Sequence, residues 1–226
     1  MRVVLIRHAH SEANAAGVLS GRRPNVHLSK KGLAQSMDLA QRLGDFIPHE
    51  IRISPMERCL QTIEPWLNEK NSNKGAKPKP IIDEGLTEVD YGDWSGKKLS
   101  VLSRSKLWPT VQNTPSHMYF PRGEGILEMQ TRALRSIHKY IKPKANGVLV
   151  VVSHGDVIKA ILASALGMHL DEFQRLIIDP ASVSVVDFSE GKPRVLLIND
   201  TRAIVTELLI SKKRTRVQLG GGGGGK

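Results

Sequence analysis

Two histidines stand directly after apolar runs that predict buried strands. Residues 3–6 are apolar and lead into Arg7 and His8, and a second apolar run at 148–152 leads toward His154. Continuous, β-branched apolar runs are typical of strands buried on both faces of a parallel sheet. Ligands of open α/β sheets bind just beyond the carboxyl ends of such strands. We therefore expect both histidines at the mouth of one cleft.

A second arginine is expected at the same edge of the sheet. The alternating residues at 50–53 predict a short strand, and the sequence then runs into Ser54, Pro55 and Arg58. A serine N-cap with proline at the first helical position is a strong helix start, reinforced here by Glu57 three residues after the serine. Arg58 would then lie in the first turn of a helix that follows a strand.

These side chains suit a phosphate group. The guanidiniums of Arg7 and Arg58 are rigid forks that match phosphate oxygens, and the helix expected after Gly155 adds backbone N–H donors and a favourable dipole. A neutral imidazole such as His8 can attack phosphorus and carry the phosphoryl group, while a carboxylic acid protonates the leaving alcohol. The acid is expected in the turn at 84–96, whose acidic residues are Glu84, Glu88, Asp90 and Asp93.

Helical periodicity predicts three helices around these residues. The first is predicted from apolar residues at steps of three and four: Leu33, Met37, Ala40, Leu43 and Ile47. The helix expected from Ser54 has its apolar stripe at Leu60, Ile63 and Leu67. Pro65 should kink that helix or end it early. The third helix has one apolar face: Ile126, Ala133, Leu134, Ile137 and Ile141.

The remaining segments predict short elements. Ile81 and Ile82 indicate a brief strand, and 182–188 with 194–198 predict two strands of a hairpin at the sheet edge. Between them, 97–125 indicates short helical pieces that form a lid over the site. Three prolines are expected to break these pieces: Pro109, Pro115 and Pro121.

Length and charge favour one domain with a basic tail. The chain has 226 residues, 40% of them hydrophobic, so we predict a single domain over residues 1–211. Residues 212–226 hold five Lys or Arg and no acid, and they include six consecutive glycines, which predicts a disordered tail. The tail carries five of the eleven net positive charges, and the moderately basic body suits a small anionic substrate.

The sequence predicts a cytoplasmic protein. No apolar run approaches the ~20 residues that a membrane span needs, and the N-terminus shows no secretory signal. Cys59 is the only cysteine and cannot form an internal disulfide, which fits a reducing compartment. The sequence leaves the oligomeric state open.

Taken together, the motifs resemble those of the histidine phosphatases of the phosphoglycerate mutase-like superfamily. The matching residues run nearly from end to end: Arg7-His8-Ala9, Asn14, Ser20-Gly21, Leu28-Ser29 with Gly32, Ser54-Pro55 with Arg58 and Gln61-Thr62, Leu86-x-Glu88, Gly92, Trp94, Gly96 and Ser153-His154-Gly155. The resemblance implies a three-layer α/β/α sandwich around a mixed, mostly parallel six-stranded sheet with one antiparallel strand. The predicted hairpin at 182–198 fits that strand.

The resemblance also implies roles for the site residues. His8 would become the phosphohistidine, and Glu88 would be the general acid and base. Three side chains would hold the phosphoryl oxygens: Arg7, Arg58 and His154. The implied substrate-binding residues are Asn14, Ser20, Gly21 and Gly155. Two positions depart from the usual pattern, since Ala9 stands for a glycine and Gly125 for the serine that many members have after Gly-Glu.

Hydrolysis and phosphoryl return to the substrate both fit this site. The mutases of this superfamily carry an insertion with paired arginines between the acid motif and the Gly-Glu motif, whereas the interval 88–124 is short here and its cations are scattered. We therefore expect a phosphatase for small phosphate monoesters that needs no cofactor. A phosphoglycerate mutase-type enzyme, which would need a bisphosphorylated primer, remains the alternative.

Two other classes explain fewer of the residues. His8 and His10 share a strand face and resemble half of a metal site, but a metallophosphoesterase would need aspartates at other strand ends, where none stands, so we expect no metal. A non-catalytic nucleic-acid-binding protein could use the basic tail. That class leaves both histidines and Glu88 unexplained, and aromatic residues make up only 4% of the chain, too few for stacking platforms.

Overall fold

The described part of the chain forms one sheet of six strands, as the sequence predicts. The computed structural model describes residues 1–69, 75–141, 147–189, 191–206 and 209. Their strands are β1 (Arg2–Arg7), β2 (Glu50–Ile53), β3 (Ile81–Ile82), β4 (Val148–Ser153), β5 (Val183–Asp187) and β6 (Arg194–Asp200), in the spatial order β3-β2-β4-β1-β5-β6. β5 runs antiparallel to both β1 and β6, while β3, β2, β4 and β1 are mutually parallel. The predicted mixed sheet with an edge hairpin is confirmed.

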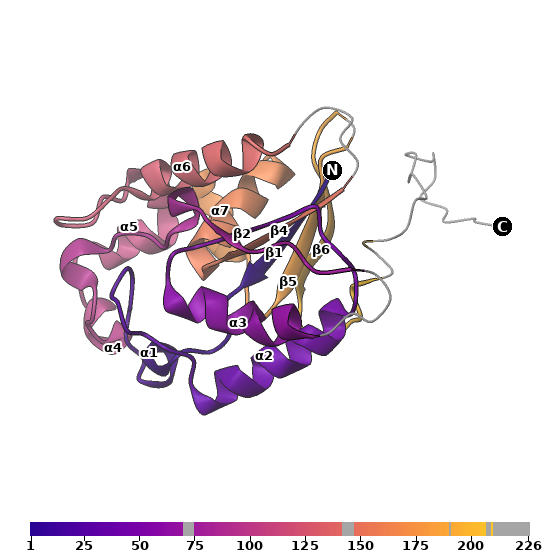
Figure 1. Ribbon diagram of the computed structural model, residues 1–226. Coiled ribbons are helices and arrows are strands. Elements are labelled where there is room, and N and C mark those ends of the chain that lie inside the picture. The colour runs from indigo at the N-terminus through magenta and orange to yellow at the C-terminus, as the bar shows by residue number, and fades with distance from the viewer. Residues whose placement is uncertain (70–74, 142–146, 190, 207–208, 210–226) are drawn as a thin grey trace.

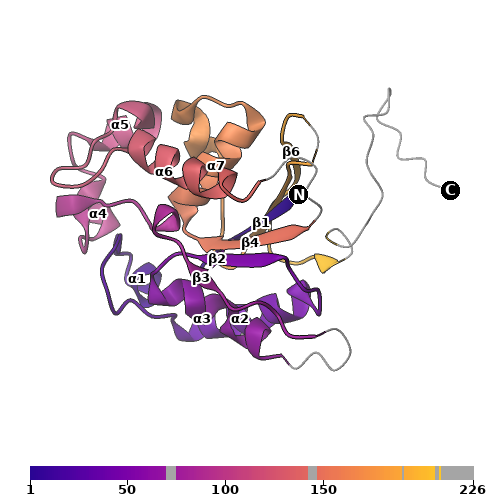
Figure 2. The same ribbon diagram turned by 45° about the horizontal axis from the view of Figure 1, so that its top comes forward.

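Helices cover both faces of the sheet (Figures 1 and 2). α2 (Lys30–Leu43) and α3 (Glu57–Asn68) lie on one face, and α6 (Ile126–His138) and α7 (Gly155–Leu166) lie on the other. Three short helices lie beyond the end of the sheet at which β1 and β4 finish: α1 (Glu12–Ala15), α4 (Leu99–Leu102) and α5 (Trp108–Asn113). Among the described residues, no helix has the length and apolar character that crossing a bilayer requires.

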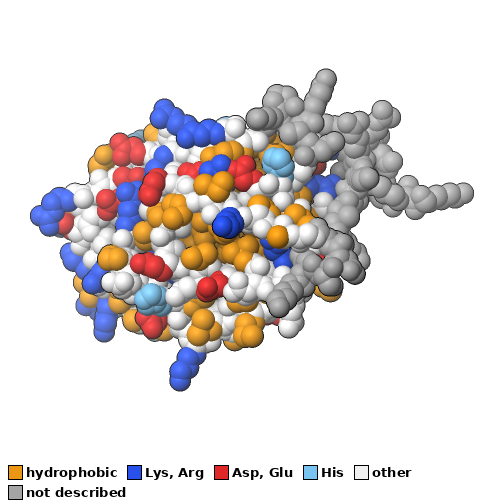
Figure 3. Space-filling model, in the orientation of Figure 1, with side chains coloured by type: hydrophobic (Ala, Val, Ile, Leu, Met, Phe, Trp, Pro, Cys, Tyr) orange, Lys and Arg blue, Asp and Glu red, His pale blue; other side chains and the backbone are white. Residues whose placement is uncertain are grey.

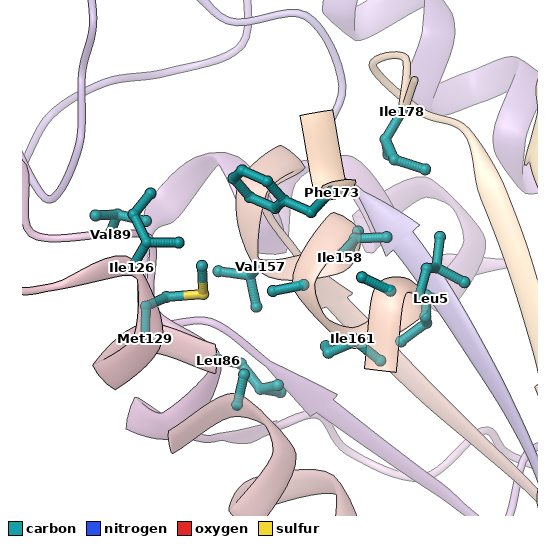
Figure 4. Close-up of a cluster of buried hydrophobic side chains, with 14 of the residues drawn as sticks. Leu5, Leu86, Val89, Ile126, Met129, Val157, Ile158, Ile161, Phe173 and Ile178 are labelled. Atoms are coloured by element: carbon teal, nitrogen blue, oxygen red, sulfur yellow. The ribbon is translucent and has the colours of Figure 1, made fainter. Parts of the chain in front are cut away.

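The central strands β1 and β4 contribute side chains to two hydrophobic cores, one on each face of the sheet. Because successive side chains of a strand point to opposite faces, Leu5 of β1 packs toward α6 and α7 while its neighbours Val4 and Ile6 pack toward α2 and α3. Figure 4 shows Ile158 and other side chains of α7 lying between β1 and α6. Both faces of β1 and β4 are therefore buried, which explains their uninterrupted apolar sequences.

The buried face of α2 differs from the predicted one. Leu33 and Met37 are 52% and 65% exposed, whereas Leu39, outside the predicted stripe, is fully buried. α2 packs closely against the backbone of His10 at Gly32, where a Cβ would lie 2.0 Å from the His10 carbonyl oxygen. Gly32 therefore lies on the buried side of α2, and the neighbouring Leu33 lies on its exposed side. Figure 3 shows hydrophobic side chains exposed on the side of the molecule that carries α2 and α3.

α3 also departs from its predicted start and stripe. It begins at Glu57 instead of Pro55, and Ser54 is not its N-cap. Leu60 is exposed, because the buried face carries polar residues, Arg58 among them, that periodicity of apolar residues does not register. Pro65 does not end the helix, which continues to Asn68.

The segment at 97–125 forms the predicted short pieces. Pro109 stands in the first turn of α5 and does not break it, while Pro115 opens a 3-10 turn, Pro115–His117. α6 ends at His138, so Ile141 lies beyond it. The predicted tail at 212–226 lies outside the described residues.

Candidate active site

Strand register brings the two histidines together. β1 and β4 are adjacent and parallel, with Arg7 opposite Ser153, so His8 and His154 follow their strands at the same level. The His8 backbone N–H donates to the Ser153 carbonyl over 2.9 Å, and the two imidazole centroids are 5.2 Å apart. His8 is 4% exposed, and His154 is completely buried. The predicted convergence at the carboxyl ends of these strands is found.

The His8 ring is held with one nitrogen free for attack. Nδ1 lies 2.8 Å from the Ala9 carbonyl oxygen, which can only accept a hydrogen bond. Nδ1 therefore carries the hydrogen, and Nε2 keeps its lone pair. Burial, together with the charges of Arg58 and Arg7, lowers the pKa of His8 well below its usual value. The ring is neutral at neutral pH, which is the state a nucleophile needs.

The guanidiniums of Arg58, which is buried, and Arg7, which is half-buried, keep unused donors beside this ring. Arg58 is fully buried, and one of its Nη atoms donates to the Gly21 carbonyl over 2.8 Å. Its Nε and second Nη, and the Nε of Arg7, have no hydrogen-bond partner among the described residues. Buried, unpaired charged donors are costly, so an anion that satisfies them would be bound strongly. This matches the predicted phosphate pocket.

His154 is fixed by Arg58 and Ser54. An Arg58 Nη lies 3.2 Å from His154 Nδ1, and because arginine has only donors, Nδ1 accepts. Nε2 then carries the hydrogen and donates to Ser54 Oγ over 2.7 Å. Burial and the Arg58 charge lower the pKa of His154 well below its usual value. Ser54, expected to cap α3, instead orients a histidine of the site.

Glu88 has the position and the protonation state of a proton donor. Its Oε2 lies 3.8 Å from His154 Nδ1, and its Oε1 accepts the Val89 backbone N–H over 3.0 Å. Burial, with the charge of Asp156 adding to it, raises the pKa of Glu88 to about 7. About half of the molecules therefore hold a neutral carboxylic acid at pH 7.

The competing acids of the same turn are engaged elsewhere. Glu84 accepts from the Thr87 hydroxyl, Asp90 accepts from the Gly92 backbone N–H, and Asp93 is paired with Arg122. This distribution supports Glu88, which the family motif singles out, over its neighbours. Asp156 was not predicted as a site residue. It accepts from the Tyr91 hydroxyl over 2.8 Å.

Of the predicted substrate-binding residues, Gly21 and Gly155 contact the arginines of the site. Asn14 forms a capping box with Ser11 at α1 through its Oδ1, which leaves its Nδ2 donors toward other partners. Ser20 lies in the same loop as Gly21, which has φ +53° and offers its carbonyl to Arg58. A Cβ on Gly21 would lie 2.9 Å from Ser95 Oγ, so a side chain there would be crowded as well as strained by the positive φ. Gly155 is the first residue of α7, beside the Arg7 guanidinium.

The sequence did not indicate the residues that bind the backbone beside His8, Arg58 and Glu88. Thr62 Oγ1 accepts the Ala9 backbone N–H over 2.8 Å and donates to the Arg58 carbonyl, so it ties β1 to α3. Arg22, Glu124 and Arg132 surround the backbone at Glu88. For Thr62 the motif match was the available signal. For the other three, no spacing in the sequence indicates that they meet.

The described residues contain no group of three or more His, Cys, Asp or Glu side chains that could hold a metal ion. His10, the second histidine of the half metal site considered above, has its Nδ1 2.8 Å from Ser29 Oγ. Nothing in the described site thus gathers a ligand set around His8.

Comparisons with known proteins agree with this geometry. The sequence model of the "Histidine phosphatase superfamily (branch 1)" matches residues 3–201. "Phosphoserine phosphatase 1" of Hydrogenobacter thermophilus is 28% identical over 206 residues, covering 89% of this chain and 93% of that protein. A "Probable phosphoglycerate mutase GpmB" of Erwinia tasmaniensis is 24% identical, covering 84% and 86%.

The fold agrees as well. The crystal structure of a "putative alpha-ribazole-5'-P phosphatase" from Escherichia coli has a TM-score of 0.77 at 24% identity, and covers 90% of this chain and 98% of that one. The resemblance inferred from the motifs is confirmed: the chain belongs to the histidine phosphatase superfamily.

Proposed function

We propose that this protein hydrolyses small phosphate monoesters in two steps through a phosphohistidine on His8. The observation that carries the proposal is the His8 ring held through Nδ1, which leaves the Nε2 lone pair free for attack. Burial raises the pKa of Glu88 to about 7, so this carboxyl can supply the proton. The unpaired donors of Arg7 and Arg58 would bind the phosphoryl oxygens between them.

In the first step, the Nε2 lone pair attacks phosphorus and the bond from phosphorus to the ester oxygen breaks. The Glu88 proton goes to the departing oxygen, so an alcohol leaves and Glu88 becomes a carboxylate. In the second step, Glu88 takes a proton from water, the water oxygen attacks phosphorus and the phosphorus–nitrogen bond breaks. His8 and the Glu88 acid are regenerated, and inorganic phosphate is released.

We also propose that this reaction needs no metal ion or organic cofactor. The charges of Arg7 and Arg58 and the N-terminus of α7 supply the positive potential that divalent ions provide in other phosphoryl-transfer sites. Activity should therefore persist in EDTA. Loss of turnover in EDTA that a divalent ion restores would contradict this part of the proposal.

The nucleophile is tested by His8→Asn, with His10→Asn as the matched control two residues away. The first variant should lose turnover of phosphoserine and of p-nitrophenyl phosphate, together with any acid-labile, alkali-stable phosphoryl label on the protein. The control should retain all three. Substantial turnover by His8→Asn would refute the phosphohistidine mechanism.

The fate of the phosphoryl group is decided by a panel of phosphorylated metabolites. Phosphoserine is included because a relative is named for it, and 3-phosphoglycerate with its bisphosphate primer because another relative is named a mutase. We expect release of inorganic phosphate to exceed isomer formation, since the interval between Glu88 and Glu124 lacks paired arginines. Faster isomer formation would make the protein a mutase.

A further inference from the structure

The backbone that carries Glu88 is held by arginines from two other parts of the chain. Glu88 lies between two 3-10 turns, Glu84–Leu86 and Gly92–Trp94, and so outside any helix or strand that would fix it. Its carbonyl oxygen accepts from Arg22 Nε over 2.8 Å and from Arg132 Nη2 over 3.0 Å. A carboxyl on an irregular segment depends on such contacts for its position.

Arg132 of α6 makes the larger share of these contacts. Its Nη1 donates to the carbonyl oxygens of Gly85 and Thr87 over 2.9 and 2.6 Å, in addition to the bond from Nη2 to Glu88. One planar guanidinium thus binds three carbonyls of the acid-bearing segment. Arginine presents five donors in a fixed fork, and no other side chain can make this set of bonds.

Glu124 joins the two arginines. Its carboxylate accepts from Arg132 Nε and Nη2 over 3.1 and 2.6 Å, from Arg22 Nη2 over 2.8 Å, and from the Asp90 backbone N–H over 2.9 Å. The Glu124 side chain is 15% exposed. Burial would raise the pKa of Glu124, but the hydrogen bonds from Arg132 and Asp90 outweigh it and lower that pKa. The bridging carboxylate therefore stays ionised at the pH at which Glu88 titrates.

We propose that Arg132, linked to Arg22 through Glu124, is a positioning residue that sets where the Glu88 carboxyl meets the leaving group. Its bonds to the acid-bearing segment all end on backbone carbonyls, so it acts on the reaction through Glu88. Displacement of a reacting group by about 1 Å costs on the order of 10² in rate. The inference rests on the proposed role of Glu88 as proton donor.

The test uses Arg132→Met and Arg132→Lys, with Arg135→Met as control. Arg135 is exposed on the same helix, and its side chain makes no hydrogen bond or ion pair with the described residues, so its replacement removes the same charge without breaking a contact. We expect Arg132→Met to lower kcat/KM for phosphoserine, which reports the first chemical step, about 10²-fold. The kcat/KM for p-nitrophenyl phosphate, whose leaving group needs no proton in that step, should change less than about threefold. Hydrolysis of the phosphohistidine, in which Glu88 is the base, is common to both substrates and enters kcat but not this comparison. Arg132→Lys should recover part of the loss, and the control should match the unmodified protein.

Combination with Glu88→Gln separates positioning from general loosening. If Arg132 acts through Glu88, adding Arg132→Met to Glu88→Gln should lower phosphoserine turnover little further, because the acid is already absent. Equal losses of kcat/KM on both substrates, or full additivity with Glu88→Gln, would overturn the inference. Should Arg132→Met fail to fold in circular dichroism, Arg132→Lys and Glu124→Gln give the same comparison, with about tenfold selective losses expected.

Two other variants, at His8 and Glu88, test the proposed phosphatase mechanism separately from the role of Arg132. If His8→Asn retains turnover, or if Glu88→Gln alone lowers kcat/KM for both substrates equally, the proposed function fails whatever Arg132 does. If those two variants behave as expected and Arg132→Met does not discriminate between the substrates, only the positioning inference fails.

Discussion

The pH dependence of the first chemical step should follow the titration of Glu88. Its pKa of about 7 means that kcat/KM for an alkyl phosphate requires a proton that is lost as the pH rises through 7. The protonated fraction falls from about nine tenths at pH 6 to about one tenth at pH 8, so kcat/KM should fall about tenfold over that interval. His8 adds no limb in this range, since its own pKa lies well below its usual value.

The assay compares phosphoserine with p-nitrophenyl phosphate from pH 5 to pH 9 at constant ionic strength. Both substrates ionise at their phosphate near pH 6, so a limb due to the substrate would appear for both. The limb due to Glu88 should appear for phosphoserine alone and should vanish in Glu88→Gln, with Glu84→Gln as a control in the same segment. A phosphoserine limb that survives in Glu88→Gln would assign the acid to another group, and Asp156, whose charge acts on Glu88, is the candidate to replace next.

Three further outcomes concern stability and geometry. The folded-state pKa of Glu88 is raised from 4.5, so the native protein loses stability as the pH rises from 4.5 to about 7 and Glu88 gives up its proton. Glu88→Gln cannot lose that proton, so its gain in the free energy of unfolding, measured in urea, should grow over this interval by on the order of 3 kcal/mol and then level off. A gain that does not change with pH would contradict the shift. Thr62→Val removes the acceptor of a buried N–H and should cost about 1–3 kcal/mol in urea unfolding, while Thr131→Val on an exposed helix position should cost less than about 1 kcal/mol. Gly32→Ala forces a Cβ against the His10 carbonyl and should lower the Tm by several degrees, whereas Gly17→Ala meets no atom within 4 Å and is strained only by its φ of +62°.

The strands that present the histidines could be predicted because their signal is local. β1 and β4 are buried on both faces, so every residue of each run is apolar, and the first polar residues mark the strand end. Arg7, His8 and His154 needed only that rule and the rule that sheets bind ligands at carboxyl ends. The choice of Glu88 among four acids needed the family motif, and the structure supports it because the other three have partners of their own.

The supporting residues could not be predicted because their contacts are long-range and made to backbone. Arg132 bonds carbonyls more than forty positions away, and a carbonyl has no identity in the sequence. Ser54 has the sequence context of an N-cap, yet its hydroxyl faces His154, one hundred residues later. The prediction of which face of α2 is buried was wrong for a related reason. Its orientation is set by a close contact at Gly32, and a count of apolar residues gives no weight to a small one.

Burial gives the two reacting side chains opposite and complementary states. In water, a histidine has a pKa near 6.5 and a glutamate near 4.5, so at any pH between these values the histidine is protonated and the glutamate is ionised. Neither could then act, since the one has no lone pair and the other has no proton to give. Desolvation disfavours both charged forms, so it lowers the pKa of His8 and raises that of Glu88. The order of the two pKa values is reversed, and a neutral base and a neutral acid coexist in one pocket. The charges of Arg7 and Arg58 favour this state of His8 but oppose that of Glu88, so the acid must be held where burial and Asp156 outweigh them. That requirement explains why so many backbone contacts converge on the segment that carries it.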